Sequence, residues 1–333
     1  MSLIEVQALS KSYRNTVKEP GVKGAFKHLI HPKYEDKVAV SHVSFTVERG
    51  EKVAYIGSNG AGKSTTIKML TGILLPTSGK ISVNGLDPHK NRIENTKNIG
   101  VVFGQRTQLW WDIPIIESFK LLKDIYEIPG PMYKKNLEIF CDILGMEQFI
   151  HQPARKLSLG QRMRADIAAS LLHNPPILYL DEPTIGLDVA VKEKVHEFLN
   201  YINKEQKTTI LLTSHDLADI EKICDRIIII DQGTVIYDDT IQKIKGELIS
   251  ERKINALIED TGNILEEKLK NLPVTVIRED TNKVSILFSQ NEIAAVTILE
   301  NMLQITGIQD FSIEEPGLEQ LIKKVYNGTF LIS

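Results

Sequence analysis

Cysteine and long apolar runs are both scarce in this sequence. Its 333 residues include two cysteines, Cys141 and Cys224, too few for a disulfide framework, so we expect a reducing compartment such as the cytosol. No apolar run approaches the roughly 18 residues that a transmembrane helix needs. The N-terminus also lacks the apolar core of a secretory signal. We therefore expect a chain that does not itself span a membrane.

A strong charge of one sign is absent as well. The 40 lysines and arginines stand against 43 acidic residues, which gives a formal charge of -3. No basic field therefore favours nucleic acid or anionic lipid as the main partner. With 42% hydrophobic and 25% charged residues, the composition is that of a globular protein and excludes a disordered or fibrous chain. The length fits about two domains of roughly 100–200 residues.

The first 242 residues show an α/β pattern. Short apolar runs without polar alternation are typical of parallel strands that helices cover on both faces. Helical spacing of apolar residues lies between them. The expected strands are Glu51–Ile56, Ile177–Leu180, Thr209–Leu212 and Ile227–Ile230, and the expected helices are Thr65–Leu74, Arg162–Leu172 and Lys192–Ile202.

Residues 246–333 have a different pattern, which predicts a small separate α+β domain. The predicted order is strand, helix, strand, strand, helix, strand, the order of the ferredoxin-like fold, with a closing helix. The predicted elements are Lys253–Glu259, Ile264–Leu272, Val274–Arg278, Val284–Phe288, Asn291–Ile305, Ile308–Ile313 and Leu318–Val325.

A glycine-rich loop follows the first of the expected strands and fits the pattern G-x-x-x-x-G-K-[ST]. Glycines let successive N–H groups turn toward a phosphate, and the helix that follows points its positive end at the same anion. Lys63 adds a cation for the β- and γ-phosphates, and Ser64 offers a hydroxyl to Mg²⁺. The loop consists of Gly57, Ser58, Asn59, Gly60, Ala61, Gly62, Lys63, Ser64 and Thr65.

Two adjacent carboxylates follow the apolar strand Ile177–Leu180. Ligands of open parallel sheets bind at the carboxyl ends of the strands, so Asp181 and Glu182 are expected near the loop. Asp181 is expected to hold Mg²⁺, and Glu182 to orient or deprotonate an attacking water.

A further string, Leu157–Gln161, resembles the LSGGQ signature of ABC transporter ATP-binding subunits, and the resemblance covers residues 3 to about 240. It departs from the signature at Leu159, where the first glycine usually stands. The resemblance implies a P-loop ABC ATPase cassette with ATP and Mg²⁺ as cofactors. It also implies that Ser158, Gly160 and Gln161 complete the ATP site of a second copy.

The same resemblance assigns the remaining site residues. Gln105 matches the glutamine that reaches Mg²⁺ and the attacking water, and His215 matches the histidine that contacts the γ-phosphate. Asp188 matches the aspartate beside the partner subunit, and Tyr13 the aromatic residue that stacks on adenine. The implied metal ligands are Ser64, Gln105 and Asp181. Catalysis is assigned to Lys63, Gln105, Glu182 and His215.

Two features depart from the bare family pattern. The insertion 15–37 is interpreted either as a solvated basic loop or as a short amphipathic element against the membrane or a permease. The adjacent Trp110 and Trp111 are interpreted either as an anchor for a permease helix or as core residues. The string that contains them, GQRTQLWWD, looks most similar to ATPases of ABC-2 type sodium and drug exporters.

These observations favour an ATPase at the cytoplasmic face of the membrane that powers export through a separate permease. The alternatives are the ATPase of a polysaccharide exporter and that of a methionine importer, since the latter also ends in a ferredoxin-like domain. A non-transport ABC ATPase is disfavoured because the chain has one cassette and no sustained heptads. A GTPase is disfavoured because no NKxD string is present.

Overall fold

The structure is a computed structural model that describes residues 2–17, 33–104, 106–248, 251–259, 264–280, 282–305, 307–314 and, near the C-terminus, residues 318, 322, 325 and 326. The chain divides into two compact units, Met1–Asp238 and Asp239–Ser333. No helix among these described residues is long and apolar enough to cross a membrane.

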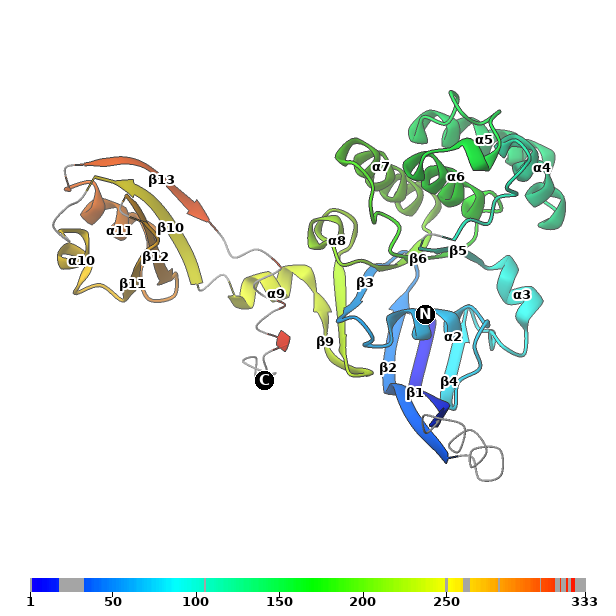
Figure 1. Ribbon diagram of the computed structural model, residues 1–333, viewed down its shortest axis with the longest axis horizontal. Coiled ribbons are helices and arrows are strands. Elements are labelled where there is room, and N and C mark those ends of the chain that lie inside the picture. The colour runs from blue at the N-terminus through cyan, green and yellow to red at the C-terminus, as the bar shows by residue number, and fades with distance from the viewer. Residues whose placement is uncertain are drawn as a thin grey trace, which may run out of the picture. The chain divides into compact units, whose positions relative to one another are not determined.

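The first unit is built around a six-stranded sheet in the order β5-β6-β7-β3-β8-β9 (Figure 1). The pairs that join β5, β6, β7, β3 and β8 are parallel. The apolar runs predicted as strands are its buried members, which confirms the α/β fold. The strands are β3 Lys52–Gly57, β5 Ile99–Phe103, β6 Ile177–Asp181, β7 Thr209–Thr213, β8 Arg226–Asp231 and β9 Thr234–Thr240.

Helices connect these strands, and α4, α5, α6 and α7 gather together in Figure 1. The helix predicted over Thr65–Leu74 ends at Leu70, because Gly72 adopts a φ of +75° and a Cβ there would lie 2.2 Å from the Pro88 carbonyl oxygen. The helices are α2 Lys63–Leu70, α3 Arg92–Lys97, α4 Ile115–Ile125, α5 Gly130–Leu144, α6 Leu159–Leu171, α7 Val189–Gln206 and α8 Leu217–Ile223, with a 3₁₀ turn at Ala154–Lys156.

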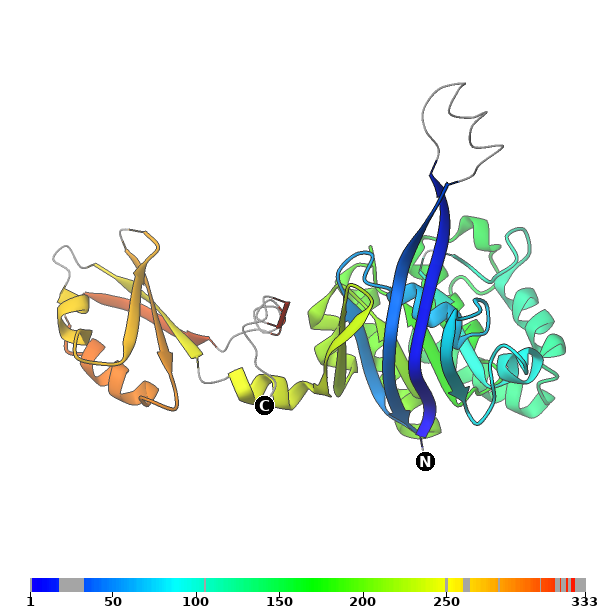
Figure 2. The same cartoon turned by 90° about the horizontal axis from the view of Figure 1, so that it is seen from below.

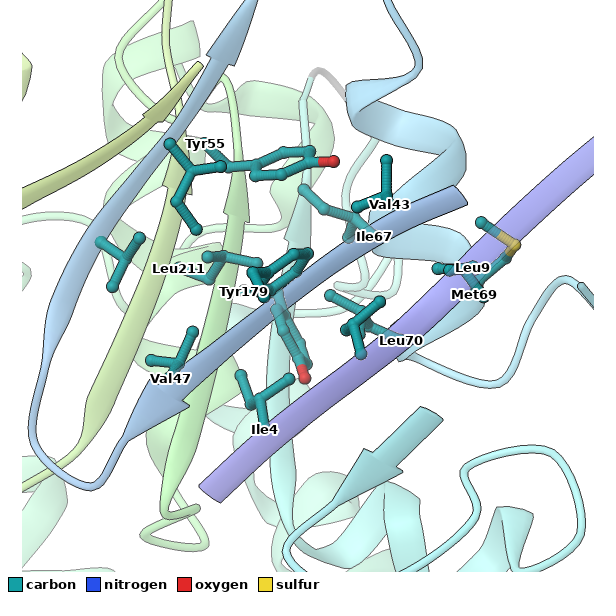
Figure 3. Close-up of a cluster of buried hydrophobic side chains, with 14 of the residues drawn as sticks. Ile4, Leu9, Val43, Val47, Tyr55, Ile67, Met69, Leu70, Tyr179 and Leu211 are labelled. Atoms are coloured by element: carbon teal, nitrogen blue, oxygen red, sulfur yellow. The ribbon is translucent and has the colours of Figure 1, made fainter. Parts of the chain in front are cut away.

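A second, antiparallel sheet packs over helix α2. It has the order β2-β1-β4, formed by β1 Ser2–Val17, β2 Lys33–Glu48 and β4 Ser78–Val83. Figure 3 shows side chains from β1, β2 and α2 meeting Tyr55, Tyr179 and Leu211 of the larger sheet in one apolar cluster. Because α2 lies in this cluster, the start of the helix is held in a fixed place between the two sheets.

The insertion predicted over 15–37 is partly sheet. Strands β1 and β2 run side by side into it (the blue strands of Figure 2), with Asn15 opposite Glu35 and Val17 opposite Lys33. Strand β2 therefore begins at Lys33, inside the insertion, because β1 continues to Val17 and supplies it with a partner. Residues 18–32, where the short amphipathic element was one interpretation, lie outside the described residues.

From β10 onward the second unit has the predicted strand and helix order, and helix α9, which was not predicted, precedes it. Its four strands form an antiparallel sheet in the order β11-β12-β10-β13, and α10 and α11 share an apolar core with it. The predicted closing helix lies mostly outside the described residues. The elements are α9 Ile241–Leu248, β10 Glu251–Ile258, α10 Ile264–Leu269, β11 Val274–Arg278, β12 Lys283–Ser289, α11 Ala295–Met302 and β13 Ile308–Glu314.

Both cysteines are free thiols, and both belong to the first unit. Cys224 follows α8 and is buried, while Cys141 lies on α5 and is half-buried.

Candidate nucleotide-binding site

The glycine loop joins strand β3 to helix α2, as its pattern predicts. Gly62 sits at the N-cap of α2 with a φ of +107°, and a Cβ there would lie 2.5 Å from the Ala39 carbonyl oxygen. Only glycine fits this position without displacing strand β2. Gly62 has no side chain to cap the helix, so the first N–H groups of α2, at Lys63, Ser64 and Thr65, face the loop without an acceptor inside the helix. This cradle of donors suits a phosphate.

Lys63 directs its ammonium group back into the loop. The side chain is 8% exposed, and Nζ donates to the carbonyl oxygens of Gly57 at 2.7 Å and Ser58 at 3.2 Å. Burial lowers the Lys63 pKa, while the charges of Glu182 and Asp181 act in the opposite direction. The cation and both predicted carboxylates therefore share one electrostatic environment.

Thr213, at the end of β7, holds both carboxylate residues. Its hydroxyl donates to Asp181 Oδ1 at 2.6 Å, and the Glu182 backbone N–H points at the Thr213 carbonyl oxygen (3.0 Å) and hydroxyl (3.2 Å). Sequence reasoning missed this residue, because a threonine in an apolar strand resembles any β-branched strand residue. The available signal was its position immediately before Ser214 and His215 in the string LLTSH.

Glu182 and His215 face each other across the ends of β6 and β7. His215 Nε2 lies 3.1 Å from Glu182 Oε1, and the His215 backbone N–H donates to Glu182 Oε2 at 3.3 Å. Glu182 reaches this position through a φ of +57°, a left-handed conformation that is uncommon outside glycine. The two predicted catalytic residues are thus brought together.

The signature residues make their contacts with α6 and α7. Ser158 caps α6: its hydroxyl accepts from Gln161 N at 3.2 Å, and Gln161 Oε1 accepts from Ser158 N at 2.9 Å. A Cβ on Gly160 would lie 3.3 Å from Val191 of α7, and one on Gly186 would lie 3.2 Å from Leu159. Leu159 therefore packs toward the turn that leads into α7.

The remaining predicted site residues either make other contacts or lie outside the described residues. Asp188 caps α7 by accepting from Val191 N at 2.8 Å. Tyr13 lies on β1, partly exposed, with Lys11 Nζ 5.5 Å from its ring centre. Gln105 lies outside the described residues. Ser58 was predicted from the motif, and its hydroxyl donates to Asp231 Oδ1 at 3.2 Å, an acceptor that the motif did not include.

The donor set also fits Mg²⁺. This ion takes oxygen ligands and is usually held by one or two carboxylates together with substrate phosphates. Ser64 supplies a hydroxyl at the start of α2, and Asp181 a carboxylate at the end of β6. With Oδ1 of Asp181 fixed by Thr213, the carboxylate has a defined orientation for such a role.

The chain is similar to several known proteins. A family model described as ABC transporter matches residues 40–185. The ABC transporter ATP-binding protein NatA of Bacillus subtilis is 35% identical over 206 residues, 62% of this chain and 83% of that protein. The methionine import ATP-binding protein MetN 2 of Enterococcus faecalis is 29% identical and covers 87% of this chain and 84% of its own length. The linearmycin resistance ATP-binding protein LnrL of B. subtilis is 29% identical, covering 89% and 96% respectively.

A solved structure is similar as well. The dimeric post-hydrolysis structure of an ATP-binding cassette bound to ADP and Pi aligns with a TM-score of 0.59 and 26% identity, over 72% of this chain and 98% of that one.

Proposed function

This chain belongs to the ABC transporter family of ATP-binding proteins, and on that premise we propose that it powers export through a separate membrane permease. As a family member it is an ATPase that binds ATP with Mg²⁺ and couples hydrolysis to transport. The proposal adds the direction of transport, the roles of individual residues and the permease contact.

The proposed chemistry is transfer of the γ-phosphoryl group to water. Lys63 and the first N–H groups of α2 neutralise phosphate charge, and Mg²⁺, which Ser64, Gln105 and Asp181 would hold, would supply further neutralisation. The Glu182 carboxylate is the acceptor for a water proton, and His215 fixes this carboxylate while reaching toward the γ-phosphate. The contact between Glu182 and His215 is the observation that supports this assignment.

We assign the signature end of α6 to a second copy of an ATP-binding subunit. Family members similar to this chain have been solved as dimers. Ser158, Gly160 and Gln161 would complete the partner's ATP site, with Asp188 beside the dimer contact. Tyr13 stacks on adenine in this proposal.

A permease contact, which either direction of transport needs, is supported by the adjacent tryptophans that follow Gln105. Trp110 is 40% exposed and Trp111 48% exposed, which disfavours the core interpretation and leaves two large aromatic groups at the surface. Exposed aromatics of this kind anchor protein interfaces, so we place the permease contact here. One relative is named for resistance to linearmycin, which fits extrusion. The chain would then act at the cytoplasmic face of the membrane, with residues 246–333 as an accessory domain.

Import is the second candidate. The methionine import protein MetN 2 aligns over 301 residues, which reach beyond the cassette. The direction is tested in membrane vesicles that contain the permease recovered with this chain. Export predicts that the transported compound accumulates in inside-out vesicles supplied with external ATP. Import predicts that it accumulates in right-side-out vesicles loaded with ATP.

The permease contact is tested by capturing tagged protein from membranes of its host. We expect the double variant Trp110→Ala/Trp111→Ala to lose the membrane subunit, because truncating an interface hot spot costs about 2 kcal/mol or more, roughly 30-fold in affinity. The matched control is Ile93→Ala/Leu75→Ala, which removes other exposed apolar side chains. Capture of the same membrane subunit by the tryptophan variant contradicts this contact.

A further inference from the structure

The segment from Thr107 to Trp111 is bound to helix α6 through contacts with Asp166 and Arg162. It carries both tryptophans of the chain. Leu109 of the segment is buried, whereas the two tryptophans that follow it are exposed. Contacts other than burial of the tryptophans themselves must therefore hold this part of the segment in place.

Asp166, in the third turn of α6, provides the main attachment. Its side chain is 4% exposed, and Oδ1 accepts from the Thr107 hydroxyl and from the Gln108 backbone N–H, both at 2.9 Å. The Gln108 side chain also donates to the Asp166 carbonyl oxygen at 2.9 Å. The Thr107 hydroxyl in turn accepts from Leu109 N at 3.1 Å, so the turn of the segment is built on this carboxylate.

Arg162 provides a second attachment one helical turn earlier. Its guanidinium lies 4.7 Å from the ring centre of Trp111, within cation–π range. Arg162 Nη2 donates weakly to the Leu157 carbonyl oxygen at 3.4 Å, while its buried Nε has no hydrogen-bond partner. Because residues four positions apart lie on the same face of a helix, Arg162 and Asp166 contact the segment from the same side of α6.

Holding a loop with a buried carboxylate carries a cost in desolvation free energy. Burial raises the pKa of Asp166 to about 6, although the bonds from Gln108 and Thr107 and the charge of Arg162 act in the opposite direction. An apolar residue would pack at this position without that desolvation cost. What the carboxylate adds is directional bonding, which fixes the segment in one orientation on the helix.

We infer that Asp166 is a positioning residue which, with Arg162, joins the tryptophan segment and helix α6 into one moving body. A partner that displaces Trp110 and Trp111 then also displaces the Ser158 end of α6. Conversely, ATP bound at that end changes the position of the tryptophans. This inference rests on the proposed function, which puts the permease at one end and the second copy's ATP at the other.

Tryptophan emission provides the test, because Trp110 and Trp111 are the only tryptophans. The full chain is measured as Asp166→Ala, Asp166→Asn and Ser170→Ala. Ser170 is a buried polar residue one turn further along α6 whose hydroxyl donates to Ile167 of the same helix, so it is the matched control. Acrylamide quenching without nucleotide reports how the segment is held. The emission change on adding Mg-ATP, in a Glu182→Gln background, reports the coupling.

We expect Asp166→Ala to increase quenching and abolish the ATP-dependent change, while the affinity for ATP stays the same because Asp166 does not touch the phosphate loop. Asp166→Asn keeps an acceptor oxygen for both bonds and should behave as the parent, as should Ser170→Ala. If Asp166→Ala does not fold, Thr107→Val removes one of the bonds from the side of the segment and should give the same loss in weaker form.

Three results would overturn the inference: unchanged quenching in Asp166→Ala, a loss in Asp166→Asn as complete as in Asp166→Ala, or an equal loss in Ser170→Ala. An absent ATP-dependent change in the parent would overturn the coupling. These failures are separate from failure of the proposed function, because quenching needs neither nucleotide nor permease.

Discussion

The backbone at Glu182 is held in a conformation that most side chains avoid. A φ of +57° follows directly after strand β6, and left-handed backbone costs a non-glycine residue about 1–2 kcal/mol. Two neighbours on the adjacent strand end stabilise it: Thr213 accepts from its N–H, and His215 N donates to its carboxylate. The conformation therefore places the carboxylate at His215 instead of letting it extend along the strand direction.

Replacing Glu182 by Gln tests its proposed part in hydrolysis. The amide keeps the shape and can still accept from His215 N, but it is not a base at neutral pH. We expect ATP turnover to fall by about 10²–10⁴-fold, the contribution of a positioned acid–base group, with ATP binding retained. Steady-state ATPase assays and calorimetric titration with ATP measure the two effects. Turnover close to that of the parent would remove Glu182 from the chemistry.

Thr213→Val tests whether the hydroxyl between the two carboxylates matters. Valine keeps the volume but removes the donor to Asp181, a bond to a charged group worth about 1.5–3 kcal/mol. We expect a turnover loss of roughly tenfold or more, with the loss reduced at high Mg²⁺ if Asp181 is a metal ligand. Thr209→Val is the control, since it removes a hydroxyl that Gly50 N uses at the opposite end of the same strand. Equal turnover losses in both variants would make the effect one of stability.

Motif spacing was enough to select the residues that meet at the phosphate loop, because each motif follows its own buried strand. Lys63, Asp181, Glu182 and His215 come from three segments and share one electrostatic environment or direct contact. Thr213 and Asp166 were not predictable in this way. A threonine within a strand and an aspartate within a helix show their role only through the partner that the fold brings to them.

At the level of elements, helices α7 and α8 are joined by a charged network. Lys192 Nζ forms ion pairs with Asp216 and with the buried Asp219, and His196 Nε2 lies 3.0 Å from Asp219 Oδ1. Asp216 follows His215 directly and caps α8 by accepting from Ala218 N. The first turns of α7, which begins after Asp188, are thereby tied to the backbone that carries His215.

Lys192→Met should loosen this connection. We expect turnover to fall about tenfold while the KM for ATP changes little, because the phosphate loop is untouched. Leaving the buried Asp219 without its cation should also destabilise the fold by about 1–3 kcal/mol. Lys192→Arg restores the charge and should recover most of the turnover. Lys204→Met, in the last turn of the same helix, is the control, and it is expected to leave both measurements unchanged.

Helix boundaries were the part of the element prediction that failed, at starts as well as at ends. Apolar spacing put the beginning of one helix at Arg162, yet α6 begins at Leu159 because Ser158 and Gln161 form a reciprocal capping box. Likewise α7 begins at Val189, three residues before the predicted Lys192, because Asp188 caps it. The capping residues also belong to functional motifs, and their second role at a helix terminus was not used in the prediction.

On the scale of the whole molecule, each of the two units has its own apolar core. The cluster around Tyr55 and Tyr179 belongs to the first, and the cluster around Ile254 and Ile286 to the second. The strand and helix order of the second unit was predictable because its apolar and polar residues alternate clearly over short elements.

Separate cores predict that the first unit folds without the second. A chain that ends at Thr240 keeps all of β9, and we expect it to bind ATP as the full chain does, with a Tm within a few degrees of the first unit's transition. A chain that ends at Asp231 loses the strand next to β8 and should melt markedly lower. Calorimetric scans and ATP titrations of the three chains measure this. Loss of ATP binding in the chain ending at Thr240 would contradict it.

The shielded thiols have a practical consequence for chemical labelling. Burial raises the pKa of Cys141 to about 11 and raises the pKa of Cys224 as well. Maleimides react with the thiolate, which is scarce at both positions at neutral pH, and Cys224 is also out of reach of a reagent. A single cysteine introduced at an exposed position would therefore react selectively in the otherwise native chain. Dyes could be attached site by site without first removing either natural cysteine.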